Sequence, residues 1–119
     1  MEELKYWLGF SLVKGIGPVR FRNLLEHFGS AMEAWNARPE ELARAGLDRR
    51  SLENLLTLRK RLSLDREMER VQKEGIRLIT WKDEDYPYNL RHVDNPPFLL
   101  FVKGELKPQD EWALSLIHI

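Results

Sequence analysis

The chain has 119 residues, which is enough for one small domain or for one domain and part of a second. It carries 19 basic and 19 acidic side chains, so the net charge of the whole chain gives no argument for a nucleic-acid partner. The lack of cysteine excludes a disulfide framework and a cysteine-based zinc site, and three scattered histidines point to no metal or cofactor. No apolar run is long enough to span a membrane and the N-terminus lacks a signal-peptide pattern, so we expect a cytoplasmic protein without a membrane partner.

Residues 1–75 have the apolar spacing of short amphipathic helices. The first helix is predicted to run to about Val13, where two glycines interrupt the pattern. Pro18 is suited to the first turn of a second helix, which Gly29 can end in a left-handed conformation. Four further helices are predicted to begin at Ser30, at Pro39, at Asp48 and at either Ser63 or Asp65, with Gly75 ending the last.

Residues 76–113 show a different pattern. The β-branched segment Ile76–Thr80 predicts a strand, and Pro87 predicts a helical turn after a polar loop. The continuous apolar run Phe98–Gly104 predicts a strand buried on both faces. A polar connection then leads to another strand. The predicted fold class is a mainly α N-terminal module at 1–75, followed by the opening of an α/β unit at 76–113.

The second half of the chain carries an ordered set of residues, namely Tyr86-Pro87, Leu90, Pro96-Pro97, Leu100-Phe101 and Lys103-Gly104. Similar residues recur in this order in the DNA-processing protein A family, also called DprA or Smf, and the chain resembles that family from Met1 to Ala113. The Gly-Ile-Gly turn and the HFGS segment of the first half are similar to the family's helix-hairpin-helix or SAM-like module. The resemblance implies that residues 76–113 begin a truncated Rossmann-like domain, in which we interpret the ordered set as structural.

The resemblance also implies a function. DprA-like proteins are not known as enzymes; they bind incoming single-stranded DNA and help load the RecA recombinase during natural transformation. The family's main DNA pocket opens at a Val-Gly-Ser/Thr-Arg turn, where this sequence instead reads LSLIHI at 114–119. We expect those six residues to be a translated sequencing-adapter artefact rather than a natural strand. We also expect the chain to be monomeric or, because Phe98–Val102 would lack neighbouring strands, aggregation-prone.

The segment Leu12–Ser30, LVKGIGPVRFRNLLEHFGS, places a Gly-Ile-Gly-Pro turn between two helices. In a hairpin that grips DNA, the glycines let the backbone approach a phosphate, and free amides at the start of the second helix donate to its oxygens. Ile16 would anchor the turn in the core, and basic side chains would make the contact salt-sensitive and independent of DNA sequence. The predicted DNA-backbone contacts are Lys14, Gly15, Ile16, Gly17, Val19, Arg20 and Arg22.

A purely structural corner is the alternative interpretation of this turn, because a short Gly-x-Gly motif is weak on its own. Residues 1–75 carry 14 basic and 12 acidic side chains, so their net charge is only slightly positive. The corresponding alternative for the protein is a helical protein-interaction module without DNA binding of its own. Binding that tolerates salt would favour that alternative.

Three further patterns receive structural interpretations. The basic cluster of Arg49, Arg50, Arg59, Lys60 and Arg61 is interpreted as a solvated helix face. Trp7 and Trp35 are expected in the core and Trp81 at its edge. The acidic run Asp83–Asp85 is expected to be a solvated turn rather than a magnesium site.

Overall fold

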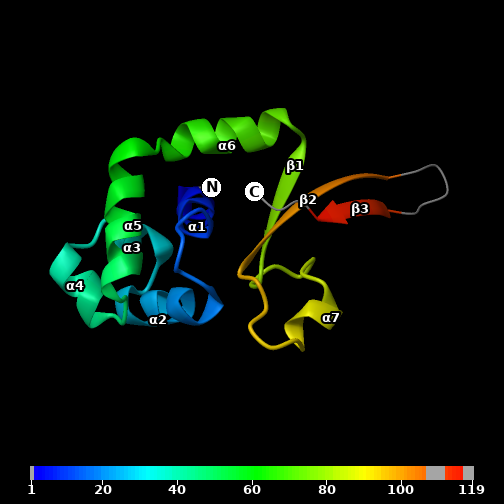
Figure 1. Ribbon diagram of the computed structural model, residues 1–119. Helices are drawn as coiled ribbons and strands as arrows, with labels where there is room; N and C mark the ends of the chain where they lie inside the picture. The colour runs from blue at the N-terminus through cyan, green and yellow to red at the C-terminus, as the bar shows by residue number, and fades with distance from the viewer. Residues whose placement is uncertain (1, 107–111, 117–119) are drawn as a thin grey trace.

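The computed structural model describes residues 2–106 and 112–116 and is mainly helical (Figure 1). The first five helices gather on one side, and the sixth leads across to a small sheet. The elements are α1 (Glu2–Ser11), α2 (Pro18–Phe28), α3 (Ala31–Trp35), α4 (Pro39–Arg44), α5 (Arg49–Arg61), α6 (Leu64–Lys73), β1 (Ile76–Thr80), α7 (Tyr88–Arg91), β2 (Leu99–Leu106) and β3 (Trp112–Leu116). The predicted order of helices followed by strands is confirmed.

The helices begin and end where the local signals indicated. Pro18 occupies the first turn of α2, and Gly29 ends that helix with φ of 88°. The side chains of Asp48 and Ser63 accept hydrogen bonds from backbone amides in the first turns of α5 and α6. The first helix is shorter than predicted, since α1 ends at Ser11 rather than near Val13. Polar side chains therefore cap the starts of α3, α5 and α6, whereas α2 and α4 begin at prolines.

The start of α3 is capped by two side chains, one of which is distant in sequence. Ser30, where this helix was predicted to begin, accepts a hydrogen bond of 3.2 Å from the amide of Glu33. The carboxylate of Glu3 accepts two more bonds, of 2.8 Å from the amide of Ala31 and 3.1 Å from that of Met32. A carboxylate at a helix N-terminus also interacts favourably with the helix dipole. Glu3 thereby fixes α1 against α3.

The sheet has three antiparallel strands in the order β1-β2-β3. Leu78 pairs with Phe101, and Ile79 pairs with Leu100. Residues Phe98–Val102 are buried on both faces as predicted, because Phe101 joins the main hydrophobic cluster while Leu100 joins a second cluster with Ile79. Both pairings between the described strands are antiparallel, which does not by itself show a Rossmann-like domain. The opening of a Rossmann-like domain therefore stays a proposal.

One hydrophobic core joins the helices to the sheet. The rings of Phe21 on α2 and Phe98 before β2 are stacked with centroids 4.1 Å apart. Trp7 on α1 packs edge-on against Phe21 at 4.8 Å and against Phe98 at 6.3 Å. Trp7 and Trp35 are buried, which confirms their expected place in the core. The position of α2 is thus fixed by residues that come from both halves of the chain.

Replacing Phe98 with alanine should remove this link. We expect Phe98→Ala to lower the free energy of unfolding by about 3 to 5 kcal/mol, because a buried ring and its stacked partner are lost together. Chemical denaturation monitored by circular dichroism measures the change. Val93→Ala is the control, since Val93 is 47% exposed and its loss should cost less than about 0.5 kcal/mol. Equal stability of the two variants would contradict the shared core.

Candidate nucleic-acid interface

The Gly-Ile-Gly turn between α1 and α2 is anchored by its apolar residues. Val13 and Ile16 are each only 5% exposed and belong to the main hydrophobic cluster. Gly15 between them adopts φ of 95°, a left-handed conformation that favours glycine. Lys14, Gly15 and Gly17 remain exposed. The sequence correctly predicted that Ile16 holds the turn in the core.

The carbonyl groups of the turn point toward α5. The oxygen of Gly15 accepts a hydrogen bond of 3.0 Å from the Ser51 hydroxyl and one of 2.7 Å from the Arg20 guanidinium. The Lys14 carbonyl accepts a bond of 2.9 Å from the amide side chain of Asn54. Sequence analysis missed Ser51 and Asn54; the available signal was a serine four residues before the buried Leu55, on the same helix face.

Arg20 is part of this network. Its guanidinium donates to the Ser51 hydroxyl at 2.9 Å and pairs with Asp48 at 3.2 Å. The pKa of Asp48 is lowered below its ordinary value. The main cause is hydrogen bonding by the side chain and the backbone amide of Ser51, and the charge of Arg20 lowers it further. The Arg20 side chain thus connects the turn to the start of α5, although 39% of its surface stays exposed.

The outer side of the turn presents backbone donors. Gly17 is the N-cap of α2, and no side chain among the described residues caps that helix. The first turn of α2 contains no acidic residue, and the amides of Val19 and Arg20 lie in the part of a helix that lacks intrahelical acceptors. A Cβ atom added to Gly17 would meet nothing within 4 Å, so the backbone there is open to a ligand. This combination suits an anion such as a phosphate group.

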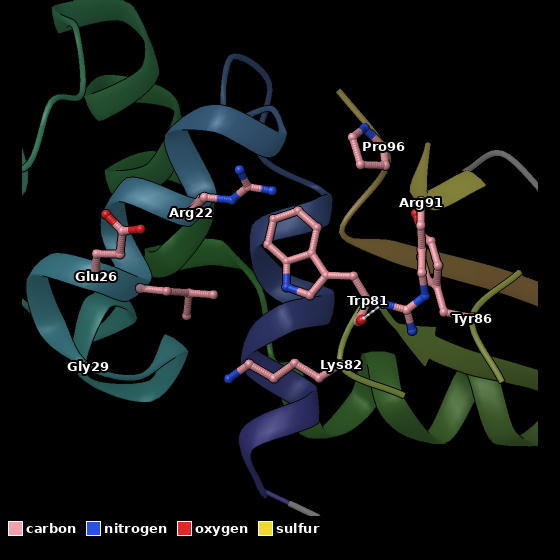
Figure 2. Close-up of a pocket in the computed structure, with 9 residues that line it drawn as sticks. Arg22, Glu26, Gly29, Trp81, Lys82, Tyr86, Arg91 and Pro96 are labelled. Carbon is pink, nitrogen blue, oxygen red and sulfur yellow. Dashed lines mark hydrogen bonds between the residues drawn. The ribbon is translucent and has the colours of Figure 1, made fainter. Parts of the chain in front are cut away.

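Arg22 lies elsewhere. It projects from α2 into a cleft beside Trp81, as Figure 2 shows, with its guanidinium carbon 5.1 Å from the centre of the Trp81 ring. The structure therefore brings together Lys14, Gly17, Val19 and the Arg20 amide at one surface. Arg22 contributes to a different one.

Two family comparisons match consecutive parts of the chain. Residues 4–57 match the DprA-like N-terminal HHH domain, and residues 77–117 match the DNA recombination-mediator protein A family. The chain is 35% identical over 106 residues to Protein Smf of Synechocystis sp.. The chain belongs to the DprA/Smf family. This alignment covers 88% of the present chain and 27% of Protein Smf. The chain therefore spans about a quarter of the length of that curated protein.

Three of the family-motif residues of this DprA/Smf chain, Tyr86, Leu90 and Leu100, lie in or against the second hydrophobic cluster. Tyr86 is 3% exposed, and its hydroxyl donates a hydrogen bond of 2.6 Å to the carbonyl of Pro97. Burial raises the pKa of the Tyr86 hydroxyl above its ordinary value. The remaining members are Pro87 at the N-cap of α7, Leu90 against the second cluster, Pro96 at the cleft, Leu100 and Phe101 buried in β2, and Lys103 and Gly104 farther along β2.

The other sequence patterns of the DprA/Smf chain also have structural partners. In the basic cluster, Arg59 donates to the carbonyls of Trp35 and Ala37, and Arg49 pairs with Glu53. In the acidic run, Asp83 accepts a hydrogen bond of 2.8 Å from the Thr80 amide. No group of three potential metal ligands was found within the described part of the chain. Among the described helices, none combines the length and apolar character that a membrane crossing requires.

Gly15 and Gly17 should respond differently to substitution. We expect Gly15→Ala to lower the free energy of unfolding by at least about 2 kcal/mol, because the new Cβ would sit in a left-handed conformation. It would also lie 2.4 Å from the Ser51 hydroxyl oxygen. Gly17→Ala should cost only about 0.5 to 1 kcal/mol, the ordinary loss at an N-cap. Denaturant unfolding of both variants tests this ranking, and a reversed order would contradict the described turn.

The charge of Asp48 should stabilise the fold in a defined pH range. Because its pKa is lowered from 3.8 in the folded state, the stabilisation is present above that value and is lost as pH falls through the lowered pKa. Asp48→Asn keeps a capping oxygen but removes the charge. We expect the stability difference between wild type and Asp48→Asn to be constant from pH 7 to about 5 and to shrink below about 4. Urea unfolding across that range measures it; a difference that grows on acidification would contradict the Arg20–Asp48–Ser51 network.

Proposed function

We propose that this chain binds single-stranded DNA through the start of α2, and that the DprA/Smf protein is a cytoplasmic recombination mediator that helps load RecA and is not an enzyme. Membership of the family supports a role in DNA processing. We propose further that residues 1–75 form the helix-hairpin-helix module and residues 76–113 open a Rossmann-like domain. The two matched ranges, 4–57 and 77–117, are compatible with that division.

The observation that carries the DNA proposal is the exposed, uncapped start of α2. Its free amides lie beside Lys14 and Gly17, whereas the carbonyls of Lys14 and Gly15 face inward and are occupied by Asn54 and Ser51. Two carbonyl acceptors of the turn are therefore already hydrogen-bonded, while the donors at the start of α2 lack side-chain caps, which favours a phosphate over a cation. Such contacts carry no sequence information, so different DNA sequences should bind similarly.

A single acidic substitution can separate DNA binding from stability. In Val19→Glu, a carboxylate in the first turn of α2 should interact favourably with the helix dipole and leave the fold at least as stable as wild type. The same carboxylate should repel phosphate and occupy the free amides, so affinity for single-stranded DNA should fall about fivefold or more. Val19 is 57% exposed, so the substitution disturbs no core contact.

Fluorescence anisotropy with labelled oligonucleotides of about 12 nucleotides measures this affinity on the 119-residue chain. Thr57→Glu is the matched control, because Thr57 is an exposed residue of α5 and the change in charge is identical. Affinity should be weak and fall steeply between about 50 and 200 mM salt. Equal affinities of the Val19→Glu and Thr57→Glu variants, or binding that ignores salt, would overturn the proposal and favour a protein-interaction module.

A further inference from the structure

A second basic surface lies beside α2, in a cleft of about 460 Å³ (Figure 2). One wall is α2, and the other is formed by the segment that follows β1 together with α7. The residues that line the cleft are Arg22, Leu25, Glu26, Gly29, Trp81, Lys82, Tyr86, Arg91 and Pro96. This cleft plays no part in the contacts assigned to the turn.

The cleft has an excess of positive charge that the described part of the chain does not neutralise. Three of its side chains are cationic, Arg22, Lys82 and Arg91, and one, Glu26, is acidic. None of the four forms an ion pair with a described residue, in contrast to Arg20, which is paired with Asp48. Arg91 donates to the backbone carbonyls of Trp81 and Asp83, which orient its guanidinium without cancelling its charge. The cleft is therefore suited to an anionic ligand.

The cationic groups lie against aromatic rings. The guanidinium carbon of Arg91 is 5.0 Å from the centre of the Tyr86 ring, much as Arg22 lies over Trp81. A second contact fixes the position of each ring. Trp81 packs edge-on against Trp7 at 6.1 Å, and the Tyr86 hydroxyl is bonded to Pro97. The half-buried Trp81 lines the cleft, where it offers a fixed aromatic surface for a planar group.

The cleft continues the face of α2 that begins at the turn. Val19, Arg22 and Glu26 are spaced i, i+3 and i+7, so they lie on one side of the helix. Phe21 and Leu24 occupy the opposite, buried side. A strand that contacts the amides at the start of α2 can follow this face directly to Arg22 and Trp81.

We propose that the cleft holds one nucleotide unit of a single strand. The phosphate lies between Arg22 and Lys82, and the base packs against the Trp81–Arg22 pair. Base stacking on aromatic side chains beside a positively charged groove is a general mode of single-strand binding. In a duplex the bases are stacked and paired inside, so they cannot reach Trp81. The inference rests on the proposed function, in which the turn contacts only the backbone and does not distinguish the two forms.

The charges are tested by a matched pair of double variants. Arg22→Gln with Lys82→Gln removes two cations that make no hydrogen bond with a described residue. Arg50→Gln with Lys60→Gln removes two exposed cations of α5. Both are compared by anisotropy on a labelled oligothymidine of about 12 nucleotides and on a duplex of the same length.

The cleft variant should bind the oligothymidine about tenfold more weakly than the α5 variant, and the salt slope should decrease by about 0.7 for the one lost phosphate contact. Binding to the duplex should be similar for the two variants. Equal single-strand affinities of the two variants would overturn the inference.

The base contact is tested with an abasic strand of the same length and with tryptophan fluorescence. Oligothymidine should bind about fivefold or more tightly than the abasic strand and should quench the emission of wild type. Trp81→Phe should lose most of that quenching. Equal binding of the two strands, or unchanged quenching in Trp81→Phe, would overturn the assignment of the base to this cleft. Tighter binding of an oligoglutamate peptide than of oligothymidine would overturn the nucleic-acid assignment in favour of an acidic peptide.

The two proposals fail in different ways. If Val19→Glu weakens binding while the cleft variant matches its α5 control, the turn binds DNA and the inference about the cleft is wrong. If the cleft variant weakens binding while Val19→Glu matches Thr57→Glu, the cleft binds the strand and the role of the turn is wrong. If wild type binds neither the oligothymidine nor the duplex, both are wrong.

Discussion

The stacked pair of Phe21 and Phe98 is the contact on which the rest of the structure depends. It joins α2 to the segment that enters β2, and Trp7 and Trp81 pack around it. Because Phe21 turns one side of α2 into this cluster, the opposite side, with Val19 and Arg22, faces solvent. The same cluster holds Trp81 at the edge of the cleft. The turn and the cleft are therefore positioned by one aromatic core, although they come from different parts of the sequence.

The polarity of the turn follows from a second constraint, the close approach of Gly15 to α5. The Ser51 hydroxyl and the Arg20 guanidinium both donate to the Gly15 carbonyl, so the acceptors of the turn are directed inward. The backbone N–H donors at the start of α2 face outward, near the exposed Lys14. In this way, a chain with equal numbers of basic and acidic side chains can still have a local site for an anion. This separation of donors from acceptors is a physical reason to assign phosphate contacts to a turn whose motif is weak by itself.

Local signals in the sequence predicted most of the elements, because caps, glycines and apolar spacing act within a few residues. The strand Ile76–Thr80 and the left-handed Gly29 are examples. Contacts between distant residues were not predictable in the same way. Glu3 capping α3, the Arg20–Ser51–Asp48 network and the pairing of β1 with β2 depend on the tertiary fold rather than on neighbouring residues. Arg22 was predicted to contact DNA together with the turn, but the structure separates it from the turn and places it beside Trp81.

The central claim is that a single strand runs from the start of α2 to the cleft. The most direct test is an NMR titration of the isotope-labelled chain with oligothymidine, which reports on each backbone amide and each indole N–H separately. We expect the largest shift changes at the amides of Gly17, Val19 and Arg20 and at the indole of Trp81, with little change along the outer face of α5. Changes confined to the basic cluster of α5, or an unaffected Trp81 indole at saturating DNA, would contradict it.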